Sequence, residues 1–307
     1  MREEFFLNVP ESKKLIAKAV LVQEDVQKAF AKGTFILHPS STTYFVLKEL
    51  GEEIPEGNEG LWVCGQVQKK GLCVSKAMVD LVLGNYKSRS QAHGGHAYPF
   101  DYIFINGKIQ ETQPLGPVLN QMGPGDVYVK AVNAIDIEGN LGVLLAVPAG
   151  GSVGHVVRSR AKQGFKLVVP TGLEKLIPTP MKKASELSTD FDDAMGIRSA
   201  LAIIKADVFI SEIEAFKLLT GCVATPIACG GINGVEGGYV FCVEGTPEQM
   251  ASARKLVDSV LGAELPKLPV YECSECPLPI CKKSPKYKKE ASDETYHKPL
   301  LKDPILA

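Results

Sequence analysis

The sequence feature that most constrains the fold is the stretch from Gly123 to Val157, GPGDVYVKAVNAIDIEGNLGVLLAVPAGGSVGHVV. Two apolar runs, VYVKAVNAI and LGVLLAVP, predict strands buried on both faces, and the polar IEGN between them predicts a turn. The glycine-rich AGGS then precedes HVVRSRAKQG, which predicts a helix. A strand that feeds a glycine loop and a helix N-terminus presents backbone N–H groups to an anion. We therefore expect Gly150, Gly151 and Ser152 to contact an anionic ligand.

Composition and charge narrow the class of protein. A chain of 307 residues with 45% hydrophobic residues has enough material for about two globular domains. The 34 Lys and Arg residues balance 35 Asp and Glu residues, which argues against nucleic acid as the main partner. The charged start MREEFFLNVPESKK is not a signal peptide, and no window approaches the roughly 18 apolar residues of a membrane helix. We expect a cytoplasmic protein with no membrane partner.

A second candidate anion contact lies earlier in the chain. Residues 10–32 predict a helical segment that Gly33 ends, and TFILHP predicts a short buried strand. Hydroxyl residues then begin the predicted helix YFVLKEL: Ser40, Ser41, Thr42 and Thr43. Hydroxyls at a helix start cap free N–H groups, and with the helix dipole they also bind phosphate or carboxylate. Both interpretations stay open from the sequence.

The pattern of predicted elements divides the chain into four parts. An N-terminal helical segment (1–32) precedes an α/β anion-binding domain (33–200), whose strand in FKLVVPTGLEKLIP ends in a loop with Glu174 and Lys175. From residue 201 to 265 the order β-α-β-β-α-β predicts a ferredoxin-like α+β domain. The helix TPEQMASARKLVDSVLG within it carries Thr246 as its N-cap. A cysteine-containing tail follows (266–307).

Three groups of residues are candidates for metal binding. His93 and His96 flank two glycines, and three acidic residues lie close together: Asp190, Asp192 and Asp193. A solvated polar loop is the more common explanation of both groups, and the loop with the two histidines is also a candidate ligand contact. The tail carries Cys273, Cys276 and Cys281, whose spacing suits zinc or an iron–sulfur cluster. A redox pair and an unliganded tail are the alternatives. A fourth ligand would come from His297, another chain or a buried cysteine.

Residues 31–178 resemble the superfamily of ribose-5-phosphate isomerase A, DeoR-type sugar-phosphate sensor domains and CoA transferases. GTFILHPSSTTYFVLKEL resembles its early strand, hydroxyl loop and helix, and AVPAGGSVGHVV resembles its glycine-rich loop. DVYVKAVNAIDIEGNLG resembles the segment that carries an Ala-Asp-Glu-hydrophobic-Asp motif in the isomerases, and KLVVPTGLEKLIP resembles their strand that ends in Ser-Lys. The resemblance implies a Rossmann-like sheet and a ferredoxin-like second domain.

The departures from that family leave two functional hypotheses. Asp136 falls where the last acid of the isomerase motif lies, but Asn133 and Ala134 replace the acids before it, and the isomerase lysine before the glycine loop is missing. The first hypothesis is an isomerase- or transferase-like enzyme for a small phosphorylated or carboxylated metabolite, with Asp136 as general acid or base and with Asn133 and Lys175 as ligand contacts. The second is a non-catalytic metabolite- or metal-sensing protein on the same fold. A second copy of the chain is a further candidate partner.

Overall fold

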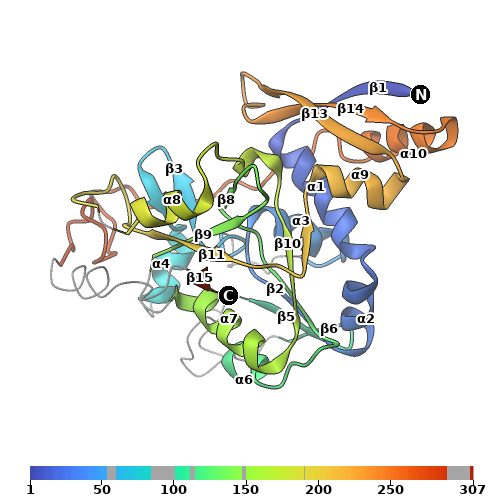
Figure 1. The fold of residues 1–307 in the computed structure, drawn as a ribbon. Coiled ribbons are helices and arrows are strands. Elements are labelled where there is room, and N and C mark those ends of the chain that lie inside the picture. The colour runs from blue at the N-terminus through green and yellow to red at the C-terminus, as the bar shows by residue number, and fades with distance from the viewer. Residues whose placement is uncertain are drawn as a thin grey trace.

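The fold is built on a mixed sheet with helices on both faces (Figure 1). The computed structural model describes residues 1–53, 60–83, 101–110, 115–146, 150–189, 191–288 and 305–306. The first four strands of the six-stranded sheet are parallel, and the last two continue it antiparallel. In spatial order the strands are β12 (Val208–Ile210), β10 (Lys166–Pro170), β7 (Val127–Val129), β2 (Thr34–Leu37), β5 (Tyr102–Ile105) and β6 (Lys108–Gln110). The prediction of an α/β fold is confirmed at this level.

Successive side chains along each strand point to opposite faces of the sheet, and each face has its own hydrophobic core. Phe35 and Leu37 of β2 face one core, whereas Ile36 faces the other, together with Tyr128 of β7. Three helices pack on the first face: α1 (Val9–Leu21), α2 (Glu24–Lys32) and α3 (Ser41–Glu49). Two others cover the second face: α6 (Leu115–Leu119) and α7 (Gly151–Gln163). The position of a residue along its strand therefore decides which group of helices it meets.

The apolar run VYVKAVNAI forms two strands in two different sheets, not the one strand that the sequence predicts. Its first part is β7, and its last part is β8 (Ala134–Ile135), which pairs with β9 (Leu141–Leu145). This four-stranded sheet has the order β15 (Ile305–Leu306), β11 (Ala200–Ile204), β9 and β8. Asn133 Oδ1 accepts the N–H of Leu144 at 3.0 Å, which replaces a backbone bond where the chain leaves the larger sheet.

A three-stranded antiparallel sheet lies at the end of the molecule that holds the N-terminus (Figure 1). Its order is β1 (Arg2–Leu7), β14 (Gly238–Glu244) and β13 (Val223–Gly230), and it packs on α9 (Glu212–Thr220) and α10 (Pro247–Asp258). The structure differs here from the predicted ferredoxin-like domain. The strands expected near residues 200–210 belong to the two larger sheets, and the N-terminal segment, predicted as helical, supplies the third strand instead.

The remaining described elements are short. They are β3 (Gln66–Gln68), β4 (Gly71–Cys73), α4 (Lys76–Val82), η2 (Leu173–Lys175) and α8 (Met181–Leu187). The predicted last strand in KLPVYEC is wrong, because residues 263–288 contain neither helix nor strand. None of the described helices has the length and apolar character needed to cross a membrane.

Candidate functional site

The strand order creates a switch point between β2 and β7. From β2 the chain builds β5 and β6 on one side, and β7 then returns on the other side of β2. Ligands of open α/β sheets bind outside the carboxyl ends of the strands at such points. The residues that follow the two strands there are His38 and Lys130, and the His38 N–H donates to the Val129 carbonyl at 2.9 Å.

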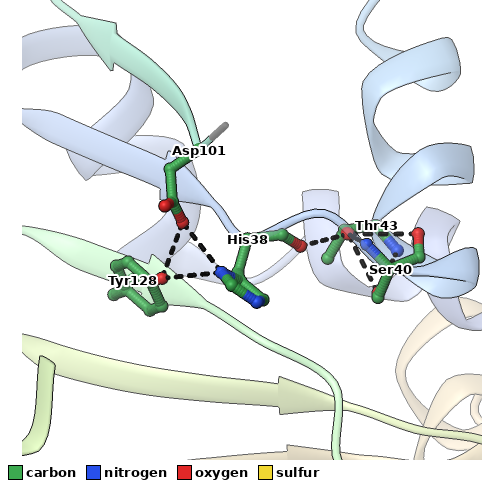
Figure 2. Close-up of polar contacts among 5 residues, drawn as sticks. All are labelled: His38, Ser40, Thr43, Asp101 and Tyr128. Carbon is green, nitrogen blue, oxygen red and sulfur yellow. Dashed lines mark hydrogen bonds and ion pairs between the residues drawn. The ribbon is translucent and has the colours of Figure 1, made fainter. Parts of the chain in front are cut away.

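His38 belongs to a buried hydrogen-bonded group with Asp101 and Tyr128 (Figure 2). Asp101 Oδ1 lies 3.0 Å from His38 Nδ1 and accepts the Tyr128 hydroxyl at 2.7 Å. The Tyr128 hydroxyl also lies 3.2 Å from His38 Nδ1. Their exposed fractions are only 3%, 3% and 0% for His38, Asp101 and Tyr128. Three strands that are distant in sequence thus bring an imidazole, a carboxylate and a phenol together at the switch point.

Burial shifts the pKa values of four side chains of this site toward their uncharged forms: His38, Lys130, Tyr128 and Cys64. Burial lowers the pKa of His38, and the charge of Lys130 lowers it further against the opposing effect of Asp101. Burial also lowers the pKa of Lys130. Burial and the Asp101 carboxylate raise the pKa of Tyr128 well above its usual value, and burial raises that of the nearby Cys64 thiol to about 11. Shifts of this kind are common in functional sites, where proton transfer or ligand binding uses them.

Two polar atoms of this group have no partner in the part of the chain that the structure describes. Among these residues, Asp101 Oδ2 is buried without a hydrogen bond. The Lys130 side chain is nearly buried, at 8% exposed, and its ammonium group makes no hydrogen bond or ion pair with the other described residues. A buried charge without a partner costs several kcal/mol, of order 3–5 in proteins, and demands an explanation. A bound anion beside Lys130 would supply the missing partner.

Ser40 and Thr43, at the start of α3, hold the backbone of His38 in place. Ser40 is the N-cap of α3, and its hydroxyl accepts the Thr43 N–H at 3.1 Å. The Thr43 hydroxyl accepts the Ser40 N–H at 2.9 Å and donates to the His38 carbonyl at 2.5 Å (Figure 2). These two hydroxyls are therefore used in capping and in holding His38. Ser41 and Thr42 fill the first turn, where N–H groups have no partner within the helix.

The glycine loop lies on the same face of the sheet as the buried group. Val153 and Val156 of α7 share a core with Tyr128, and α7 leads into the amino end of β10, so the helix starts toward the carboxyl edge. Gly150 and Gly151 have φ values of 78° and 54°, a conformation that favours glycine. The structure is thus compatible with the predicted role of Gly150, Gly151 and Ser152, while residues 147–149 lie outside the described chain.

Asp136, the predicted catalytic carboxylate, has both of its oxygens engaged in hydrogen bonds within the protein. Its Oδ1 accepts the N–H groups of Glu138 and Asn140 at 3.0 and 2.9 Å in the β8–β9 turn. Its Oδ2 accepts the Asn140 side chain at 3.0 Å and the Met181 N–H of α8 at 2.8 Å. Burial raises its pKa, but these hydrogen bonds outweigh burial and the net shift is downward. A carboxylate whose oxygens already accept several hydrogen bonds is a poor base. The side chain of Asn133, another predicted contact, also accepts a hydrogen bond within the β8–β9 hairpin.

Replacing Asp136 by asparagine should lower stability without changing ligand binding. The amide would point an NH2 group at backbone donors and lose part of the network, at a cost of about 1–2 kcal/mol in the free energy of unfolding. Urea unfolding measures this loss, and titration with anions measures binding. If a folded Asp136→Asn protein no longer binds anions, Asp136 takes part in anion binding and this prediction is wrong.

Lys175 lies in a second buried group, at the ends of β10 and β12, and not beside Lys130. It follows Glu174, whose carboxylate pairs with Lys13 of α1 at 3.2 Å. Glu212, at the start of α9, accepts the Leu173 N–H at 2.9 Å. Burial lowers the pKa of Lys175, and the charge of Lys13 adds to this effect. Lys175 therefore has the Glu174 carboxylate nearby, whereas Lys130 has no ion pair among the described residues.

The predicted metal ligands have different outcomes. His93, His96, His297 and Asp190 lie outside the described residues, and Asp193 pairs with Lys282 at 2.7 Å. Cys273, Cys276 and Cys281 are half-buried and unoxidised. Within the described part of the chain, no three or more His, Cys, Asp or Glu side chains are already arranged to hold a metal ion.

No protein-family model, curated protein or solved structure matches this chain. The functional hypothesis therefore depends on the site itself. The sequence interpretation missed His38, Asp101, Lys130 and Cys64 as a group. A signal was present: His38 and Lys130 each follow an apolar strand directly, and Asp101 directly precedes one.

Proposed function

We propose that the chain binds a small anionic metabolite, phosphorylated or carboxylated, at the carboxyl edge of the six-stranded sheet. The observation that carries this proposal is Lys130 at the switch point between β2 and β7, a nearly buried lysine whose ammonium group has no partner among the described residues. The helices α3 and α7 both begin toward this edge, and their dipoles favour negative charge there. The ligand's negative charge would offset the cost of burying Lys130.

The neighbouring groups suit proton transfer on such a ligand. The Asp101 carboxylate orients the His38 ring and the Tyr128 hydroxyl, as a carboxylate does for many catalytic imidazoles. His38 replaces Asp136 as the group that would give or take a proton, and Lys130 would stabilise negative charge that develops on the ligand. An isomerase- or transferase-like reaction on a Rossmann-like scaffold of the ribose-5-phosphate isomerase and CoA-transferase type fits this arrangement.

A non-catalytic metabolite sensor is the second candidate. The observation that favours it is the position of Asp136, which leaves none of the acids of the isomerase motif in a reactive environment. On this hypothesis Lys130 and the helix starts bind the anion, and the His38 group only shapes the site. Binding without turnover of any bound metabolite would support the sensor over the enzyme.

The test compares Lys130→Met with the control Lys205→Met, whose side chain is exposed. Inorganic phosphate and a panel of sugar phosphates and carboxylates are the probes, with thermal unfolding and calorimetry as readouts. We expect the control to bind like the wild type, and Lys130→Met to bind at least about tenfold more weakly. Without ligand, Lys130→Met should be the more stable protein, because an unpaired buried charge is gone. Equal anion binding by Lys130→Met and the wild type would refute the proposal.

A further inference from the structure

The C-terminal segment, residues 263–288, packs against the rest of the protein although it has no regular secondary structure. Residues 263–288 contain neither helix nor strand, yet Leu278 and Ser284 are both only 5% exposed. Loops longer than about 12–15 residues without secondary structure are uncommon in compact domains. Such a segment keeps a defined path only where specific ties hold it to the rest of the chain.

The segment is tied to the β3–β4 hairpin and α4, about 200 residues earlier in the chain. The Lys76 N–H donates to the Pro269 carbonyl at 2.8 Å, the Tyr271 hydroxyl donates to Asp80 at 2.6 Å, and Lys70 pairs with Glu272 at 2.9 Å. These contacts bring the segment against β4, which ends at Cys73.

Cys73 is therefore close to the cysteines of the tail. Its neighbours Leu72 and Val74 belong to the same apolar cluster as Cys276 and Cys281. The Lys70–Glu272 ion pair holds the residue before Cys273 at the same hairpin, so all three tail cysteines lie near the strand that carries Cys73. None of the four cysteines is oxidised.

Backbone turns present the tail cysteines. The Glu275 N–H donates to the Glu272 carbonyl at 3.0 Å and closes a turn around Cys273. The Ser284 N–H donates to the Cys281 carbonyl at 2.9 Å, and the Ser284 hydroxyl donates to the Cys276 carbonyl at 2.5 Å, which joins the two turns. Paired turns with a Cys-x-x-Cys spacing are typical of structural zinc sites.

We propose that Cys73, Cys273, Cys276 and Cys281 bind one zinc ion, which fastens the C-terminal segment to the β3–β4 hairpin. The four thiols are not arranged to hold a metal ion in this structure, so the proposal requires the two turns to approach Cys73 when zinc binds. Four thiolates around Zn²⁺ carry a net negative charge, and three lysines of the hairpin and the tail supply positive charge to this region: Lys70, Lys282 and Lys283. Each thiol releases its proton to solvent when it ligates the ion.

The other cysteines belong elsewhere. Cys64 lies beside Lys130 and Asp101 in the candidate anion site. Three more belong to the three-stranded sheet or its margin: Cys222, Cys229 and Cys242. Cys229 is exposed on β13 and provides the matched control, because its replacement by serine leaves the proposed set intact.

The test measures the metal content of the full-length protein and its variants by mass spectrometry. We expect about one zinc ion per chain in the wild type and in Cys229→Ser, and loss of stoichiometric zinc in Cys73→Ser and in Cys276→Ser. Thermal unfolding should show that a chelator destabilises the wild type and Cys229→Ser, but not the two zinc-free variants. Stoichiometric zinc in Cys73→Ser would overturn the assignment of Cys73, and iron in place of zinc would overturn the choice of metal.

A spectroscopic titration tests the site even if a cysteine variant does not fold. Cobalt(II) added to the metal-free wild type should give the intense visible and near-ultraviolet bands of a tetrahedral tetrathiolate, and one equivalent of zinc should abolish them. A weak, octahedral spectrum, or no uptake of either ion, would refute the proposal. Neither readout depends on the anion site, so the two proposals stand or fall separately.

Discussion

Replacing Lys13 by methionine is expected to lower the free energy of unfolding by about 3–5 kcal/mol. The side chains of Lys13 and Glu174 are only 7% and 12% exposed, and their charged atoms lie 3.2 Å apart. Neither oxygen of Glu174 has a hydrogen-bond partner among the described residues, so the ion pair with Lys13 offsets the cost of burying the carboxylate. Removing the lysine leaves the carboxylate buried beside Glu212, with only Lys175 nearby, and urea unfolding measures the resulting loss.

A matched control separates burial from the loss of any lysine on α1. Lys18 lies on the same helix and pairs with Glu49 at 2.9 Å, but both side chains are 25% exposed. Lys18→Met should therefore cost no more than about 1 kcal/mol. The double variant Lys13→Met/Glu174→Met should recover most of the loss, because no charge is then left unpaired. Equal losses for Lys13→Met and Lys18→Met would contradict this account.

The elements that the sequence predicts well carry their signals locally. Ser40 caps α3 and Thr246 caps α10, as the hydroxyl residue at the start of each predicted helix indicates. Each signal lies within a few residues of the element that it specifies. The apolar run VYVKAVNAI around Lys130 carries no such local signal. Its pattern predicts a strand but does not say with which sheet each part pairs.

The candidate site is harder to predict for the same reason. Asp101 and His38 are 63 residues apart, and Tyr128 and His38 are 90 residues apart. Only the pairing of β2 with both β5 and β7 makes them neighbours. Asp136 matches a family motif in the sequence. In the structure its carboxylate accepts a hydrogen bond from Met181, 45 residues later, which the motif does not predict. The proximity of Cys73 to the tail cysteines likewise depends on packing between distant segments.

The second buried group also predicts a pH dependence of stability. Burial raises the pKa of Glu212 from 4.5 to about 7, and the charge of Glu174 adds to this effect. The folded state therefore binds the proton more tightly than the unfolded state. Its contribution to stability is complete below pH 4.5 and is lost as the pH rises through about 7. The shift corresponds to about 3 kcal/mol across this window.

Glu212→Gln should abolish this dependence. The amide remains neutral at every pH, and its oxygen still accepts the Leu173 N–H. At pH 5 the variant and the wild type should have similar free energies of unfolding, whereas at pH 8 the variant should be more stable by about 2–3 kcal/mol. Urea unfolding at both pH values measures this difference, with the exposed Glu186→Gln as a control that should follow the wild type. A Glu212→Gln protein that loses stability between pH 5 and 8 as steeply as the wild type would show that another group causes the dependence.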